Sequence, residues 1–202
     1  MKIVVIGAGG DVGRFVADEL AREGKHEVIR VGRTRGDHQV DIARDDSVSA
    51  LFKQIGTVDA IVVAAGNVIL APIEEMTTAD FHRGLQDKLL GQVRVALIGQ
   101  HYLSDGGSIT LTSGVAVEDP IAQGANAAAS NAGIEGFVRA AACDFHRGIR
   151  INAVSPTVLI ESMDRFGPFF PGYEGVPAAM VAKAYRRSVE GVQSGRVYRV
   201  GH

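Results

Sequence analysis

The residues with the clearest chemical meaning form a glycine-rich turn near the start of the chain. Gly7, Gly10 and Gly13 recur at three-residue spacing between an apolar run, Lys2 to Ile6, and an amphipathic stretch. The first pattern predicts a buried strand and the second a helix. Glycines permit close approach of a ligand, and free N–H groups at a helix N-terminus attract anions. The turn is therefore a candidate pyrophosphate site, with a ligand-free strand-to-helix turn as the alternative; its residues are Gly7, Gly9, Gly10, Asp11, Val12 and Gly13.

Two arginines and a threonine follow the second predicted strand, Glu27 to Val31. Many dinucleotide-binding proteins carry an acidic residue here, which accepts hydrogen bonds from the adenosine ribose. This chain instead has Arg33, Thr34 and Arg35. Guanidinium groups bind phosphate through charge-assisted, bidentate hydrogen bonds. We therefore expect NADP(H) to be preferred over NAD(H), with Arg33 and Thr34 at the 2′-phosphate; the alternative is that the arginines are solvated loop charges.

Short apolar runs alternate with amphipathic stretches along the whole chain. This order predicts an α/β, Rossmann-type, three-layer doubly wound parallel sheet of about seven strands in a single domain over residues 1–202. The remaining strands are expected at Gln39 to Ile42, Ala60 to Ala64, Ser108 to Thr112, Arg150 to Val154 and Arg196 to Val200. Later helices are expected from Asp45 or Asp46 to Ile55, from Ala79 to Tyr102 with Thr78 as cap, and from Gly124 to His146. The proline- and glycine-rich segment Thr157 to Pro177 predicts an irregular loop beside the site.

Composition restricts the class of protein and its partners. The chain is 46% hydrophobic and 22% charged, which is typical of a folded globular protein. A net charge of −2 provides no basic field for nucleic acid or an anionic membrane, and the apolar stretch Ala60 to Pro72 is too short to span a bilayer. The single cysteine, Cys143, has no intrachain partner, and the histidines lack metal-ligand spacing. We expect a cytoplasmic protein that binds no nucleic acid, membrane or metal.

The order of motifs resembles that of the short-chain dehydrogenase/reductase (SDR) superfamily over nearly the whole chain. Asp41-Ile42 is similar to the family's Asp–hydrophobic pair at the adenine, and Ala64-Ala65-Gly66 to its Asn-Asn-Ala-Gly segment. Leu111-Thr112-Ser113-Gly114 resembles the strand that carries the catalytic serine. Ile151-Asn152-Ala153-Val154-Ser155-Pro156 is close to the sixth-strand motif and continues into Thr157-Val158.

The resemblance implies an oxidoreductase that acts on a carbonyl or alcohol of a small molecule. It also implies a homo-dimer or homo-tetramer that pairs through the two long helices. The cofactor-binding residues that it adds are Asp41, Ile42, Ala64, Ala65, Gly66, Pro156 and Val158.

The chain departs from this family at the residues that carry the chemistry. The positions of the family's Tyr-x-x-x-Lys motif fall on Ala127 and Asn131, and the position of its asparagine falls on Lys88. Lysine and asparagine are thus exchanged, so Lys88 could supply the missing ammonium and Asn131 the amide. The catalytic candidates are Ser113, Lys88 and Asn131. The alternative for Lys88 is a helix-rim lysine with its head in water, and Ser113 could simply satisfy a backbone group.

Two other function classes stay open because fold does not fix function. The first is a non-catalytic NADP(H)-binding sensor or regulatory protein. The second places an S-adenosyl compound or a nucleotide sugar on the glycine turn. Phe166, Phe169 and Phe170 would make an apolar lid if the Thr157 to Pro177 loop closes over the site.

Overall fold

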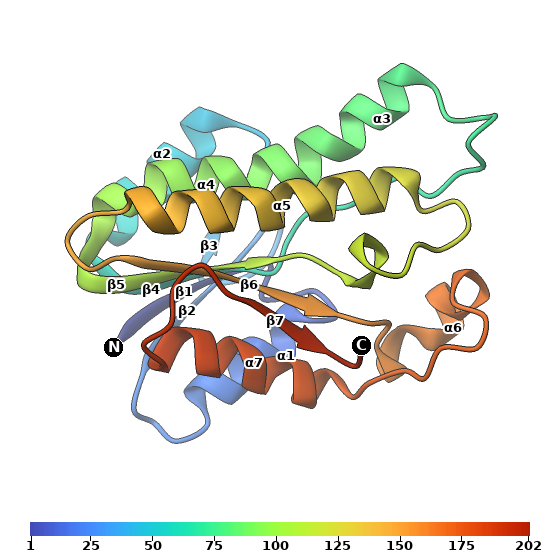
Figure 1. Cartoon of the computed structure of the whole chain (residues 1–202). Coiled ribbons are helices and arrows are strands. Elements are labelled where there is room, and N and C mark those ends of the chain that lie inside the picture. The colour runs from blue at the N-terminus through green and yellow to red at the C-terminus, as the bar shows by residue number, and fades with distance from the viewer.

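Seven parallel strands form the middle layer of the protein, which is described over residues 1–202 by a computed structural model (Figure 1). Their order across the sheet is β3-β2-β1-β4-β5-β6-β7. The strands are β1 (Lys2–Ile6), β2 (Glu27–Gly32), β3 (His38–Gln39), β4 (Val58–Val63), β5 (Leu103–Thr112), β6 (Arg150–Pro156) and β7 (Val197–Val200). The predicted Rossmann-type fold class is confirmed.

Helices cover both faces of this sheet. Figure 1 shows α1 (Gly13–Ala21) and α7 (Ala178–Glu190) on one face, and α2 (Asp45–Ile55), α4 (Gly91–Gly99) and α5 (Ala125–Asp144) on the other. α3 (Thr78–Gly84) leads through a π-helical turn, η1 (Leu85–Leu90), into α4. The short α6 (Met163–Phe166) lies beyond the carboxyl ends of the strands. None of these helices is both long and apolar enough to cross a membrane.

Side chains that alternate in direction along the strands form a hydrophobic core on each face of the sheet. Ile3 and Val5 pack with α1 and α7, whereas Val4 and Ile6 point to the opposite face and pack with α2, α4 and α5. All four side chains are buried. Because β1 is covered on both sides, its sequence is apolar throughout rather than alternating with polar residues.

The chain reverses its direction of winding at β1. Strands β2 and β3 lie on one side of β1, and β4 to β7 follow on the other. At such a switch point the loops after neighbouring strands diverge and leave a crevice at the carboxyl ends. The glycine turn, which follows β1, lies at the base of this crevice.

Several predicted elements differ from the structure in their bounds or form. β3 covers only His38–Gln39, because Asp41 and Ile42 turn away from the ladder toward α2. The cap of α3 is Thr77 rather than Thr78, since its hydroxyl accepts a hydrogen bond from the N–H of Asp80. The predicted long helix is interrupted by η1, and the loop after Thr157 contains α6 and three-residue 3-10 turns on either side of it.

Candidate active site

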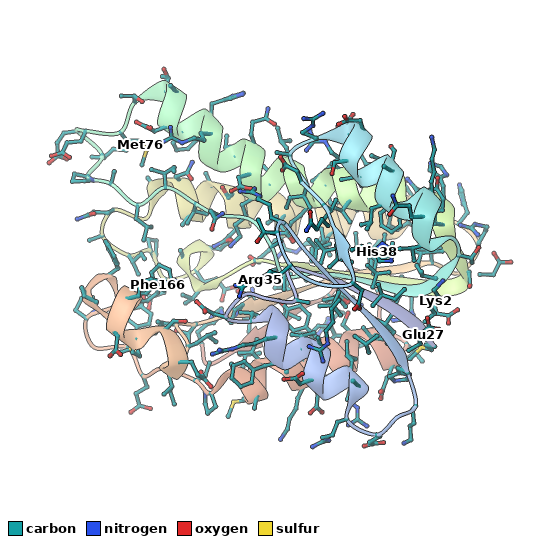
Figure 2. All side chains as sticks on the ribbon, turned by 180° about the vertical axis from the view of Figure 1, so that it is seen from behind. Lys2, Glu27, Arg35, His38, Met76 and Phe166 are labelled. Atoms are coloured by element: carbon teal, nitrogen blue, oxygen red, sulfur yellow. The ribbon has the colours of Figure 1, made fainter.

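A cleft of about 760 Å³ lies at the carboxyl ends of the strands. Figure 2 shows Phe166, which borders this cleft, at the end of the molecule away from Lys2 and Glu27, where β1 and β2 begin. Most predicted site residues line the cleft: Gly7, Gly9, Gly10, Asp11, Val12, Arg33, Thr34, Ile42, Ala64, Ala65, Gly66, Lys88, Ser113, Asn131, Pro156 and Val158. Gly13 and Asp41 do not belong to the lining.

The glycine turn has the shape that a phosphate site needs. Gly7 has φ +88°, in the left-handed region, and a Cβ at Gly13 would overlap the carbonyl oxygen of Gly7. Gly13 therefore lets α1 approach the turn rather than meeting a ligand. Gly9 faces open space, and the backbone N–H groups of Gly9, Asp11 and Val12 donate to no protein acceptor. These free donors at the start of α1 suit a pyrophosphate.

Arg33 borders one end of the cleft and lies between two carboxylates. The Arg33 guanidinium lies 3.2 Å from Asp87 Oδ1 and 3.7 Å from Asp41 Oδ1. Asp41 also accepts the N–H of Ala43, which fixes the turn after β3 and points Ile42 into the cleft. Gly91 leaves room for Ile42, since a Cβ there would come within 2.9 Å of the Ile42 side chain. These residues form a wall with an apolar centre and a charged rim.

Lys88 is carried into the cleft by the π-helical turn. Gly66, at φ +112°, lies so close that a Cβ there would be 2.7 Å from the Cα of Lys88. The half-buried Lys88 side chain has one weak protein acceptor, the carbonyl oxygen of Ser113 at 3.5 Å. Burial lowers the pKa of the Lys88 ammonium to about 8. π-helical turns frequently mark functional sites, and this one presents a lysine able to exchange a proton near neutral pH.

The Ser113 hydroxyl has a partner outside the cleft. It donates to Glu135 Oε1 at 2.9 Å, and Arg139 donates to the other oxygen of the same carboxylate at 2.9 Å. Ser113 is 2% exposed and Glu135 is also 2% exposed. A hydroxyl has one proton to donate, so Ser113 could hydrogen-bond a substrate carbonyl only by leaving Glu135.

Two buried oxygen atoms beside the cleft have no hydrogen-bond partner. They are Oδ1 of Asn131 and Oγ1 of Thr157. The amide nitrogen of Asn131 reaches the carbonyl oxygen of Gly114 at 3.5 Å, which leaves its oxygen free. Buried polar atoms without partners are rare and indicate a missing ligand or water. Together with the free N–H groups of the glycine turn, they show that the polar lining fits a bound dinucleotide.

Neither Tyr173 nor Tyr185 takes the place of the family's tyrosine, whose position in the sequence falls on Ala127. Tyr185 is fully buried under the sheet, and its hydroxyl is 2.6 Å from Oγ1 of Thr112. Burial raises the pKa of this phenol above its usual value. Tyr173 bonds the carbonyl of Asp119 at 3.2 Å and is absent from the cleft lining.

Four residues that shape the site were missed by the sequence analysis. Gln92 is fully buried and binds both the N–H and the carbonyl of Thr112, which fixes the end of β5. Glu135 holds Ser113, Asp87 holds Arg33, and Arg165 pairs with Asp11 across the cleft. Glu135 and Arg139 have the spacing of a helical ion pair, but such pairs usually lie in solvent, so the sequence offered no sign of a buried carboxylate.

Comparison with known proteins gives the family. A family model described as enoyl-(acyl carrier protein) reductase matches residues 3–187. The chain belongs to the SDR family. Protein lin1944 from Listeria innocua is 48% identical to this SDR chain, with a TM-score of 0.96 and 99% of each chain covered. A small-chain dehydrogenase solved in complex with NADPH is 28% identical, with a TM-score of 0.87 over 99% of this chain and 96% of that one.

Curated relatives of this SDR chain include fungal reductases. The hydroxynaphthalene reductase-like protein Arp2 of Metarhizium brunneum is 32% identical over 176 residues, which cover 76% of this chain and 66% of that protein. The matched segment thus spans just under two thirds of the relative. The family match places this chain among SDR proteins, which include reductases and dehydrogenases.

Proposed function

We propose that this protein is an NADP(H)-dependent oxidoreductase that interconverts a carbonyl and an alcohol on an apolar small molecule, with Lys88 as the proton donor and acceptor. The observation that carries the proposal is the half-buried Lys88 ammonium, which lines the cleft with a pKa of about 8 and a single weak acceptor. A group with a pKa near the working pH is suited to transfer a proton in either direction.

Arg33 supports the choice of NADP(H). Its guanidinium, with Thr34 and Arg35, borders the cleft just after β2, where a ribose 2′-phosphate meets donors in dinucleotide-binding folds. When bound, the nicotinamide would supply the hydride. In this proposal the N–H groups of the glycine turn hold the pyrophosphate, Ile42 contacts the adenine, and Pro156 and Val158 border the nicotinamide.

Asn131 and Ser113 have supporting roles in this proposal. The free Oδ1 of Asn131 would accept a hydrogen bond from the nicotinamide ribose or from a bridging water. The carbonyl of Ser113 orients the Lys88 ammonium, and Glu135 fixes Ser113 through its hydroxyl. Ser113 is thus proposed as a positioning residue.

The opposite end of the cleft favours an apolar substrate. Phe166, Phe170, Ile121, Val115 and Leu70 line it, and Ala127 presents only a methyl group beside them. Burying a flat apolar molecule against such walls is favourable, while Lys88 provides a polar contact for its oxygen atom. The fungal relatives are named as hydroxynaphthalene reductases, so a fused-ring quinone or naphthol is the first substrate class to test.

The test is a spectrophotometric assay of NADPH oxidation with naphthoquinones, aromatic ketones and short polar aldehydes. We expect turnover with the apolar carbonyls and none of comparable efficiency with the polar aldehydes. Lys88→Met should abolish this turnover without loss of NADPH binding. Turnover that survives Lys88→Met would refute the role of Lys88, and preference for polar aldehydes would refute the substrate class.

A non-catalytic NADP(H)-binding protein is the second candidate. The observation in its favour is that the Ser113 hydroxyl already donates to Glu135. It is therefore not available, beside Lys88, as a second hydrogen-bond donor to a substrate at the end of β5. Tight NADPH binding with no turnover on the whole carbonyl panel would support this function instead.

We also propose a homo-oligomer in which α4 and α5 pair with another copy. Leu90 and Leu97 are exposed next to a smooth face of α5 that contains Ala125, Ala132 and Gly136. Light scattering coupled to size-exclusion chromatography measures the molar mass and hence the oligomeric state. Gly136→Arg should lower the molar mass toward that of a monomer. A monomeric mass for both the original protein and the variant would refute the proposal.

A further inference from the structure

An ion pair crosses the cleft above the glycine turn. Arg33 follows β2, whereas Asp87 lies on η1 next to Asn67, which follows β4. Because β1 lies between β2 and β4 in the sheet, the pair joins the two sides of the crevice at its switch point. Nη2 of Arg33 is 3.2 Å from Oδ1 of Asp87, and all three side chains line the cleft.

Asp87 is the fixed member of this pair. Its Oδ2 accepts two hydrogen bonds from Asn67, one from the backbone N–H at 3.2 Å and one from the side-chain amide at 2.9 Å. The side chain of Asp87 is 21% exposed, whereas that of Arg33 is 59% exposed. A long, exposed guanidinium reorients at lower cost than a carboxylate held by two bonds, so Arg33 is the partner that moves.

We infer that Asp87 is an affinity-determining residue that restrains Arg33, because a dinucleotide entering the cleft must separate the two side chains and only a 2′-phosphate offers Arg33 a new partner. This inference rests on the proposed function, in which Arg33 receives that phosphate. NAD(H) would break the ion pair without replacement. NADP(H) would exchange one carboxylate for a phosphate group with more charge and three acceptor oxygens.

Asp41 is a second carboxylate close to Arg33. Its Oδ1 is 3.7 Å from the same guanidinium, so Arg33 lies between two carboxylates in the structure. A neutral ribose hydroxyl competes poorly with them, whereas a phosphate competes well. Asp87 thus raises the cost of binding for both dinucleotides, and only NADP(H) recovers that cost, through the new contact between Arg33 and its phosphate.

The experiment compares NADH and NADPH affinities of the full-length protein by fluorescence titration. The variants are Arg33→Ala, Asp87→Asn, the double variant, and Asp46→Asn as a control that removes an exposed ion pair with Arg44 outside the cleft. An asparagine at position 87 retains an oxygen for Asn67, so the loop after β4 should keep its place.

For NADH, we expect Asp87→Asn and Arg33→Ala each to tighten binding about twofold to fivefold, the range given by an exposed ion pair. The double variant should bind NADH no more tightly than either single variant, since all three remove the same contact. Asp46→Asn should leave both affinities unchanged. For NADPH, Arg33→Ala should weaken binding about tenfold or more, because a charge-assisted bidentate contact is lost.

The outcomes separate this inference from the proposed function. NADH affinity that is unchanged or weaker in Asp87→Asn would overturn the role of Asp87, whatever NADPH does. NADPH affinity that is unchanged in Arg33→Ala would instead refute the 2′-phosphate site, and with it the recovery of that cost by NADP(H). Thermal unfolding of each variant confirms that the comparison is made between folded proteins.

Discussion

The two halves of the cleft, to which we assign the adenosine and the nicotinamide of the proposed cofactor, are built from different groups. Inside the charged rim at Arg33, the proposed adenosine half is built from backbone turns and apolar contacts: the glycine turn, Ile42 and the Ala64-Ala65-Gly66 segment. The nicotinamide half depends on side chains, namely Lys88, Asn131 and Ala127. Backbone donors are independent of side-chain identity, so a binding half can persist while the chemical groups opposite it are exchanged.

The same difference appears in how each half is held. Steric fit fixes the turn, because Gly7 and Gly13 touch backbone atoms that any side chain would displace. In the proposed nicotinamide half, hydrogen bonds of buried polar residues do the positioning: Ser113 donates to Glu135, and Gln92 donates to the carbonyl of Thr112. The halves should therefore respond differently to substitution.

The largest expected effect separates chemistry from binding. Lys88→Met should lower kcat for carbonyl reduction about a hundredfold to ten-thousandfold, the usual contribution of a general acid. NADPH affinity should change little, because the Lys88 ammonium contacts the carbonyl of Ser113 rather than Arg33 or the glycine turn. Single-turnover absorbance and fluorescence titration measure the two quantities, and a parallel loss of both would erase the distinction between the halves.

A substitution in the glycine turn should instead weaken NADPH binding. Gly13→Ala would force its Cβ into the Gly7 carbonyl, so we expect an unfolding free energy lower by about 1–3 kcal/mol and NADPH binding weaker by about tenfold. Gly9→Ala is the matched control, because nothing lies within 4 Å of a Cβ there and stability should hold within about 0.5 kcal/mol. Equal destabilisation by both variants in thermal unfolding would contradict the steric argument.

The pH dependence sharpens the assignment of Lys88. Its pKa of about 8 means that the protonated donor form predominates below that pH. The rate of carbonyl reduction should therefore fall about tenfold for each pH unit above 8, while alcohol oxidation, which needs the neutral amine, should rise up to the same pH and then level off. In Lys88→Arg the step near pH 8 should disappear; its persistence would assign the titration to another group.

The smallest effect on turnover is expected at Ser113. In Ser113→Ala the buried Glu135 carboxylate loses a donor, so the unfolding free energy should fall by about 1–3 kcal/mol. Turnover should stay within about threefold of the original, since Lys88 keeps the backbone carbonyl of residue 113 as its acceptor. A loss of a hundredfold or more would return Ser113 to the reacting centre.

Much of the fold could be predicted because it depends on local patterns. Lys2–Ile6 and Asp45–Ile55 were expected with the boundaries that the structure has, since a strand buried on both faces and a helix begun by acidic residues leave strong signals. β3 was misplaced because it has only two residues, and its pairing with β2 depends on the loop between them. The short helix α6 was missed because prolines and glycines surround it.

The sequence by itself determined the sheet, the position of the glycine turn and the residue types available at each end of the cleft. Only the tertiary structure decided which of these side chains are free to act. Ser113 bonds Glu135 from the next helix, Arg33 is held by Asp87, and Lys88 is left half-buried with one weak acceptor. Periodicity reports the burial of an element, but the partner of a polar group lies tens of residues away, and its distance is set by packing that no local pattern encodes.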